Sequence, residues 1–154
     1  MSIKKILLDY DIQASAPRLA VADYVLSTKD HPTAEEVKTQ VEKRMPTVST
    51  ATIYNTLNLF VEKGLLKVVP DPLTEKQRYD ANTQAHFHFY DEDTGRLVDL
   101  DPSLLRVSPN FSKLNAEFEV KQIEVMLRGR LKRSLKNRNK SNSKEGETYD
   151  NNND

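Results

Sequence analysis

The residues with the clearest chemical potential are two closely spaced histidines, His86 and His88, in a chain that has only three histidines. They alternate with two phenylalanines, so on a β-strand both imidazoles would lie on one face and both phenyl rings on the other. Asp80 lies six residues before His86, and Asp99 lies thirteen residues after it. Imidazole and carboxylate together suit a divalent first-row metal such as iron, manganese or zinc. The spacing indicates a candidate metal site, although paired histidines on a strand are also compatible with an ordinary exposed polar face.

The composition narrows the kind of site and the class of protein. The chain has no cysteine, which excludes disulfides, thiolate zinc ligands and thiol redox switches, so a metal site must use nitrogen and oxygen ligands. No apolar run approaches the roughly 18 residues of a membrane span, and the apolar stretch near the N-terminus is too short for a signal peptide. We therefore expect a cytoplasmic protein with no membrane partner. The formal net charge is +0, so nucleic-acid binding would have to rest on a local surface.

The elements that must position these residues begin with helices. Apolar spacing predicts two helices at the N-terminal end of the chain. Thr33, followed three residues later by Glu36, forms a capping box and predicts the start of a third helix. Ser49 is a suitable N-cap for a fourth helix over residues 50–63, which Gly64 would end in the left-handed conformation.

Two capped helices joined by a short turn indicate a helix-turn-helix, the second helix of which reads DNA in proteins of that kind. The outer face of this second helix is polar and can offer hydroxyl and amide groups to base edges and phosphates. On it we place Thr50, Thr52, Tyr54, Asn55, Thr56 and Asn58. An ordinary solvated helix face would have the same composition, so the surface is a candidate.

Strand patterns follow the helices. Residues 65–70 and 76–80 predict a hairpin, which after a helix-turn-helix would be the wing of a winged-helix domain. Residues 96–100 and 118–127 predict further strands, with a short helical piece around 111–116 between them.

These elements predict an α+β protein in three parts. Residues 1–80 would form an N-terminal winged-helix DNA-binding domain. Two or three strands with one apolar face rarely stand alone, so we infer that residues 81–131 form a small α/β dimerisation domain that pairs with a copy of itself. Residues 132–154 are almost devoid of apolar side chains and would form a disordered tail.

Four pieces of the sequence, in this order, resemble the Fur family of metal-dependent bacterial repressors, and within it the peroxide-sensing PerR branch. They are Ala16-Pro17-Arg18; His31-Pro32-Thr33-Ala34-Glu35; Ser49 through Leu57; and Arg78-Tyr79-Asp80 through His86-Phe87-His88 to Leu97-Val98-Asp99. The resemblance runs from about residue 10 to residue 130. It implies a homodimer that binds double-stranded operator DNA.

The resemblance also implies a regulatory site for Fe²⁺ or Mn²⁺. Carried over residue by residue, its ligands would be His31, Asp80, His86, His88 and Asp99. DNA contacts would come from Arg18, Ser49, Thr50, Thr52, Tyr54 and Asn55. Peroxide sensors of the family have aspartate at the position of Asp99, where iron sensors have glutamate. In the peroxide sensors, metal-catalysed oxidation of a ligand histidine, here expected at His31 or His86, releases the metal and ends repression.

The chain departs from the family at its cysteines. The family usually has two Cys-x-x-Cys pairs that bind structural zinc. The first pair would fall at Asp91 and Thr94, and the second near Leu131 and Ser134. No structural zinc is therefore expected, and packing must hold the sheet of the dimerisation domain together.

Four functional hypotheses follow. The leading one is a metal-dependent repressor, not an enzyme, that senses hydrogen peroxide through oxidation of a ligand histidine. Its closest rival is an iron-responsive repressor that uses the same site for reversible metal binding. A small non-haem iron enzyme would also use two histidines and a carboxylate, but it would leave the helix-turn-helix unexplained. The last is a structural metal-bound dimer whose helix-turn-helix binds protein.

Overall fold

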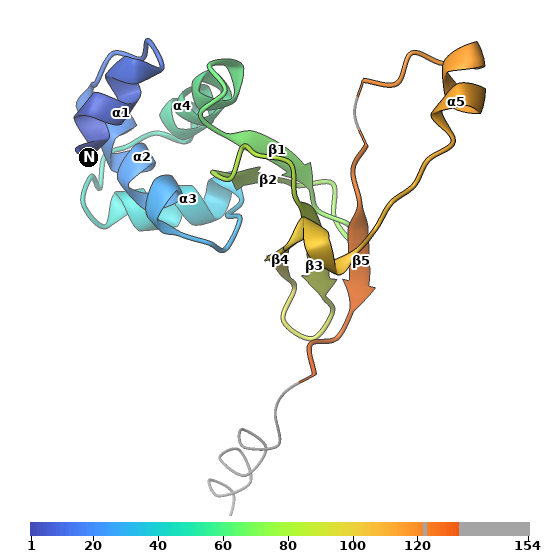
Figure 1. Ribbon diagram of the computed structural model, residues 1–154. Coiled ribbons are helices and arrows are strands. Elements are labelled where there is room, and N and C mark those ends of the chain that lie inside the picture. Colours follow the sequence, from blue (N-terminus) through green and yellow to red (C-terminus); the bar gives the residue numbers. More distant parts are fainter. Residues whose placement is uncertain (122, 133–154) are drawn as a thin grey trace, which may run out of the picture.

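The computed structural model describes residues 1–121 and 123–132. Four helices and a two-stranded hairpin form one unit, and a three-stranded sheet forms a second unit beside it (Figure 1). We call these the helical unit and the sheet unit. The mixed architecture confirms the predicted α+β class. None of the helices in these residues is long and apolar enough to cross a membrane.

The helical unit begins with four capped helices. They are α1 (Ile3–Asp9), α2 (Ala16–Ser27), α3 (Ala34–Glu42) and α4 (Thr50–Glu62). Every one follows a Ser or Thr N-cap, and the hydroxyls that cap α1, α3 and α4 accept a backbone N–H of the first turn. The capping box of Thr33 and Glu36 is present in full, as the sequence predicted.

The apolar faces of these helices meet in one core. Its fully enclosed side chains include Leu7, Ile12, Val21, Val37, Ile53, Leu57 and Phe60. The core thus holds α3 against α4, the helix-turn-helix pair predicted from the sequence. Thr56 is buried with this core, so its predicted place on the outer face was wrong. It lies three residues after Ile53 and four before Phe60, which puts it on the same side of the helix as both.

The hairpin leads from the helices to the candidate site. Gly64 ends α4 with a φ of 75°, the left-handed conformation that glycine adopts without steric cost. Strands β1 (Lys67–Pro70) and β2 (Gln77–Asp80) then pair antiparallel, with Lys67 opposite Asp80. This register places Asp80 at the open end of the hairpin, opposite its turn.

The sheet unit has the strand order β4–β3–β5. Strand β3 (Phe87–Asp91) pairs antiparallel with β4 (Arg96–Leu100) and parallel with β5 (Met126–Gly129). The connection from β4 to β5 contains the short 3-10 helix η1 (Pro102–Leu104) and helix α5 (Phe111–Glu117), which extends away from the sheet (Figure 1).

The predicted strand over residues 118–127 was largely wrong. The strand begins only at Met126, and the described residues before it have no regular structure. Alternating apolar residues indicate that an extended segment would have one apolar and one polar face. They do not indicate whether a neighbouring strand is present to pair with that segment. Here the chain returns from α5 and reaches β3 only at Val125, whose carbonyl accepts the amide of His88 at 3.1 Å, and the paired register begins at Met126. The predicted tail lies outside the described residues, apart from the exposed Lys132.

A buried carboxylate fastens the end of this sheet. Asp91 is only 2% exposed. Its Oδ2 accepts the hydroxyl of Thr94 at 2.6 Å, and its Oδ1 accepts the amide of Leu131 at 3.4 Å. The resemblance places one pair of zinc-binding cysteines at Asp91 and Thr94 and the other near Leu131 and Ser134. In this chain Thr94 and Leu131 both donate a hydrogen bond to Asp91, so the two regions are held together by this aspartate. We call this the Asp91 clasp.

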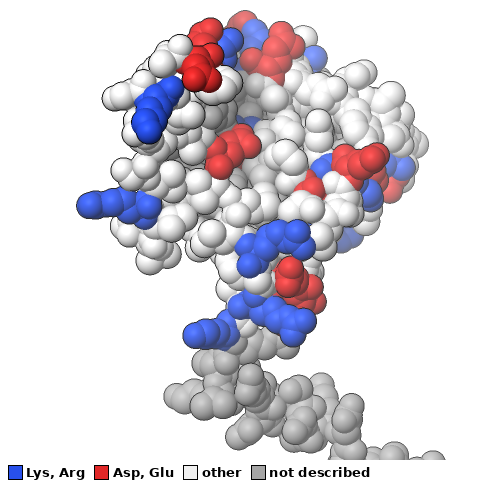
Figure 2. All heavy atoms as spheres, turned by 90° about the vertical axis from the view of Figure 1, so that its right-hand side faces the viewer, with Lys and Arg blue, Asp and Glu red and all other residues white. Residues whose placement is uncertain are grey.

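Ion pairs flank the Asp91 clasp on the surface. Acidic and basic side chains lie side by side next to the grey part of the chain (Figure 2). Arg128 pairs with Glu92 at 3.2 Å, and Arg130 pairs with Asp93 at 3.2 Å. Exposed pairs of this kind contribute about 0–1 kcal/mol each, so the buried clasp should contribute more.

We expect the substitution Asp91→Asn to lower the free energy of unfolding by about 1–3 kcal/mol, because the amide cannot accept hydrogen bonds on both of its ends. Urea denaturation of the full chain measures this loss. Asp93→Asn removes an exposed charge from the same turn and should change stability by less than about 1 kcal/mol. Equal stability of Asp91→Asn and the unsubstituted protein would show that the clasp contributes nothing.

Candidate metal centre

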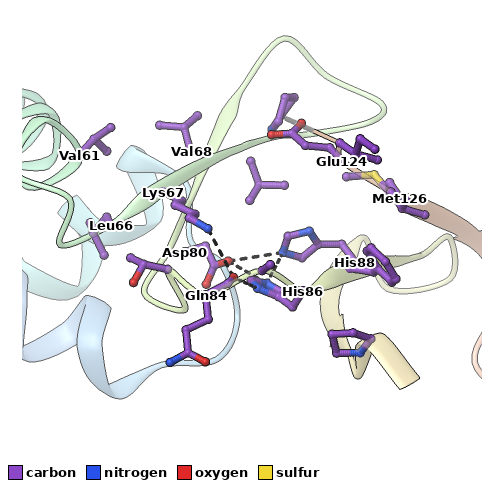
Figure 3. Close-up of a pocket in the computed structure, with 18 of the residues that line it drawn as sticks. Val61, Leu66, Lys67, Val68, Asp80, Gln84, His86, His88, Glu124 and Met126 are labelled. Atoms are coloured by element: carbon purple, nitrogen blue, oxygen red, sulfur yellow. Dashed lines mark hydrogen bonds and ion pairs between the residues drawn. The ribbon is translucent and has the colours of Figure 1, made fainter. Parts of the chain in front are cut away.

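The structure brings all five sequence-predicted ligands together. One ligand atom of each side chain lies within 4.8 Å of those of all the others. The five are His31, from the loop between α2 and α3; Asp80, at the end of β2; His86, just before β3; His88, in β3; and Asp99, in β4. The group joins the helical unit to the sheet unit, and three of its members are drawn in Figure 3, where Asp80, His86 and His88 point toward one another.

The contacts have the dimensions of a coordination shell. The Nε2 atom of His31 lies 2.8 Å from Oδ1 of Asp99. The Nε2 atom of His86 lies 2.9 Å from Nε2 of His88 and 3.0 Å from Oδ2 of Asp80. Around an octahedral ion with bonds of about 2.1 Å, neighbouring ligand atoms would be about 3.0 Å apart and opposite ones about 4.2 Å apart. The closest separations in the group, 2.8 to 3.0 Å, are near the value for neighbouring ligands.

Hydrogen bonding within the described residues leaves some of these atoms without a partner. His31 and Asp80 are each only 4% exposed. Both ring nitrogens of His31, and Oδ2 of Asp80, make no hydrogen bond. The short contact from His31 to Asp99 therefore lacks hydrogen-bond geometry. An unsatisfied buried polar group costs about 1–3 kcal/mol. A cation at the centre of the group would remove that cost for Nε2 of His31 and for the Asp80 oxygen.

The tautomer of His86 favours metal binding. Its Nδ1 lies 2.8 Å from the carbonyl oxygen of Gln84. A carbonyl can only accept, so Nδ1 carries the proton in the neutral ring, and Nε2 presents its lone pair to the other ligands.

Asn82 was not among the sequence-predicted site residues, yet it holds both carboxylates. Its backbone N–H donates to Oδ1 of Asp80 at 2.7 Å, and its side-chain amide donates to Oδ2 of Asp99 at 3.3 Å. The other oxygen of each carboxylate is thereby left facing the histidines. The Asp-x-Asn spacing is that of an Asx turn and could have indicated the first bond. The second bond depends on the fold.

The electrostatics of the site keep Asp80 ionised. Burial alone would raise the pKa of Asp80, but the hydrogen bond with His88, the hydrogen bond from the Asn82 amide, and the electrostatic influence of the nearby His31 and His86 outweigh it and lower the pKa below its ordinary value. A carboxylate at neutral pH is the form that binds a metal. Three imidazoles and two carboxylates suit Fe²⁺, Mn²⁺ or Zn²⁺.

A cavity reaches the site from one side. Its volume is about 980 Å³, and it lies between the hairpin and the segment that enters β5. Its walls are largely apolar, including Val61, Leu66, Val68 and Met126, while Asp80, His86 and His88 also line it (Figure 3). A small uncharged molecule in the cavity would meet the histidines directly.

Five of the six candidate DNA residues lie on α4 or at its N-cap, Arg18 lies in α2, and none of them belongs to the metal group. Thr50, Tyr54 and Asn55 are exposed on α4, and Thr52 is half-buried. The Ser49 hydroxyl caps α4 by accepting the Thr52 amide at 3.0 Å.

Tyr54 and Arg18 also have hydrogen-bond partners within the protein. The Tyr54 hydroxyl donates to Glu35 of α3 at 3.3 Å. Arg18, in α2, is half-buried and donates to the carbonyl of Gln13 at 3.2 Å.

Comparison with known proteins extends these observations. The model of the ferric uptake regulator family matches residues 10–128. The peroxide-responsive repressor PerR of Staphylococcus aureus is 31% identical over 109 residues, which cover 71% of this chain and 73% of that protein.

Solved structures with the same fold have lower sequence identity. The Campylobacter jejuni peroxide stress regulator has a TM-score of 0.60 at 24% identity and covers 86% of this chain and 96% of that one. The ferric uptake regulator of Pseudomonas aeruginosa, solved with manganese, has a TM-score of 0.60 at 22% identity and covers 86% of this chain and 100% of that one. By the extent of the family match and the identity to its relatives, the chain belongs to the ferric uptake regulator family.

Proposed function

We propose that the protein is a metal-dependent transcriptional repressor whose regulatory ion is Fe²⁺ or Mn²⁺ and whose iron form senses hydrogen peroxide. The regulatory ligands would be His31, Asp80, His86, His88 and Asp99. The observation that carries the proposal is the convergence of these five side chains from both structural units on one point. The resemblance to a repressor named as peroxide-responsive supports the sensing mode.

The placement of His31 supplies the mechanism. His31 belongs to the helical unit, whereas His86, His88 and Asp99 belong to the sheet unit. An ion that needs all of them binds best when the two units are close together, and it stabilises that arrangement by mass action. In the proposed organisation, residues 1–80 bind DNA and residues 81–131 dimerise, so the ion sets the separation of two recognition helices.

The proposed DNA surface is the exposed side of α4 and its N-cap Ser49, together with Arg18 of α2. It comprises Arg18, Ser49, Thr50, Thr52, Tyr54 and Asn55. Hydroxyl and amide groups of this kind can contact base edges and phosphates.

Peroxide sensing would use the cavity and the ligand histidines. The apolar cavity gives a small uncharged oxidant a path to the imidazoles of His86 and His88, which line it. Bound iron would activate the peroxide by lending it electrons that the ring returns, so that the imidazole is the group oxidised overall. The overall reaction transfers one oxygen atom from hydrogen peroxide to the ring of His31 or His86 and releases water. The oxidised ring is a poor ligand, so the ion leaves and the two units separate.

The ligand set also bears on the enzyme hypothesis. Oxygenases of the two-histidine, one-carboxylate type keep several coordination positions open for substrate and oxygen. Five protein ligands leave about one open position on an octahedral ion, which is enough for peroxide but not for an additional substrate. We therefore propose a regulator and not an enzyme.

The experiment that tests the proposal selects duplexes from a random-sequence library with the Mn²⁺-loaded full-length protein and then measures their affinity with and without Mn²⁺. We expect an enriched sequence whose binding weakens strongly when the ion is removed. No enrichment would contradict the DNA-binding function. Enrichment without dependence on Mn²⁺ would contradict the metal-dependent mechanism.

A further inference from the structure

Arg78 contacts three separate parts of the fold near the candidate metal centre. It lies in β2, two residues before Asp80, and its side chain is 13% exposed. Its Nε donates to Oδ2 of Asp71 at 2.7 Å. Its Nη1 donates to the backbone carbonyl of His31 at 3.3 Å, and its Nη2 donates to the carbonyl of Gly95 at 3.2 Å. One side chain thus joins the hairpin loop, the loop of His31 and the turn between β3 and β4.

The first consequence concerns the backbone of His31. Its φ is 49°, in the left-handed region that residues other than glycine rarely adopt. Neighbouring contacts with β2 hold this conformation. The carbonyl of His31 accepts from Arg78, and the carbonyl of Pro32 accepts the amide of Tyr79 at 2.9 Å. The strand that ends in one ligand, Asp80, therefore fixes the backbone of another.

The second consequence concerns the two units. Gly95 belongs to the sheet unit, whereas Arg78 and His31 belong to the helical unit. The hydrogen bond from Arg78 to Gly95 is made when the units are close together, as they must be for His31 to meet Asp99. The guanidinium of Arg78 therefore contacts the backbone of His31 and also stabilises the arrangement in which the two units are close together.

The guanidinium is itself held in place. Asp71 is buried, and its Oδ1 accepts the amides of Leu73 and Thr74, both at 3.0 Å. Its other oxygen is thus aimed at Arg78. A planar guanidinium has five donors in a fixed fork and can serve three acceptors at once, whereas an ammonium at the end of a flexible stem cannot reproduce that geometry.

We propose that Arg78 is a positioning residue that holds His31 in its metal-binding conformation and links it to the sheet unit. The inference rests on the proposed metal site. It adds to that site a residue, Arg78, that is not itself a ligand. Partners that orient a metal ligand typically contribute about 10–100-fold to metal affinity. Arg78 acts on the backbone of the ligand, so we expect an effect near the lower end of that range.

The test measures Mn²⁺ affinity of the full chain in a double-mutant cycle. Arg78→Lys keeps the charge and should weaken Mn²⁺ binding about 10-fold. In a His31→Ala background the same substitution should cause no further loss, because the residue through which Arg78 acts is gone. Arg44→Lys is the matched control, since Arg44 forms an exposed ion pair with Asp23 within the helical unit, and it should leave Mn²⁺ affinity unchanged.

The Mn²⁺ affinities of these variants support or overturn the role of Arg78. Unchanged Mn²⁺ affinity of Arg78→Lys would overturn it. Equal losses in the presence and absence of His31 would also overturn it, because they would show a general effect on structure. Failure of the unsubstituted protein to bind Mn²⁺ would instead overturn the proposed metal site.

If Arg78→Lys does not fold, Asp71→Asn replaces it in the same cycle, since it loosens the guanidinium without removing it. The expected result is a smaller loss of Mn²⁺ affinity that again disappears in the His31→Ala background. A loss that persists there would overturn the inference.

Discussion

Replacement of His31 by alanine is expected to remove most of the metal dependence of DNA binding. His31 and Asp80 are the ligands that the helical unit contributes, and Asp80 is the last residue of β2, where the chain leaves that unit. Without His31, an ion bound to the remaining ligands therefore favours the closed arrangement much less. Coupling between two sites typically amounts to 5–150-fold in affinity, and we expect a loss of about 100-fold at a Mn²⁺ concentration that saturates the unsubstituted protein. Fluorescence anisotropy of a selected duplex measures the loss.

Tyr54→Phe provides a control, because it should weaken DNA binding without changing its dependence on the metal. It removes a hydroxyl from the proposed DNA surface and leaves all five proposed ligands in place, so DNA affinity should fall while Mn²⁺ affinity stays the same. Because Tyr54 also donates to Glu35, urea denaturation should accompany the measurement. Full Mn²⁺-dependent DNA binding by a folded His31→Ala variant would contradict the bridging role of the ion.

Exposure of the ferrous form to hydrogen peroxide is expected to abolish DNA binding, and the loss should persist after the peroxide is removed and iron is added back. The reason is that oxidation of a ligand imidazole removes a nitrogen donor permanently, whereas simple loss of the ion would be reversible. The manganese form, treated in the same way, should keep its DNA affinity because Mn²⁺ in this ligand set does not reduce peroxide. The measurement is DNA affinity before treatment, after treatment and after addition of fresh iron.

The substitution Asp99→Glu is the matched comparison for this experiment. A longer carboxylate keeps the charge but shifts the oxygen that now lies 2.8 Å from His31. We expect metal binding to remain and the peroxide response to weaken. An undiminished response would remove the reason for assigning peroxide sensing to the aspartate at this position. Recovery of DNA binding on addition of iron would favour the reversible iron-responsive alternative.

Local chemistry explains which parts of the fold could be predicted from the sequence. The Thr33 capping box, the Ser49 N-cap and the left-handed Gly64 are short-range features, and the structure confirms all three. The ligands are spread from position 31 to position 99, and composition alone could not have joined them. Their grouping was predicted through the resemblance to a family, and the structure places one ligand atom of each within 4.8 Å of those of the others.

The features that were missed depend on which segments become neighbours. Whether the alternating residues near Phe118 form a strand depends on where the chain meets β3, and the paired register begins only at Met126. The roles of Asn82 and Arg78 arise from hydrogen bonds across 17 to 47 positions of the chain. The Asp91 clasp likewise joins positions 40 residues apart. Local patterns contain no information about such pairs.

The most direct test of the central claim is the intact mass of the ferrous protein before and after brief exposure to hydrogen peroxide, with the manganese form as control. Our account predicts a gain of one oxygen atom in the iron form alone, which peptide mapping assigns to His31 or His86. A protein that binds iron, loses DNA affinity after peroxide and yet shows no added oxygen on either histidine would contradict it.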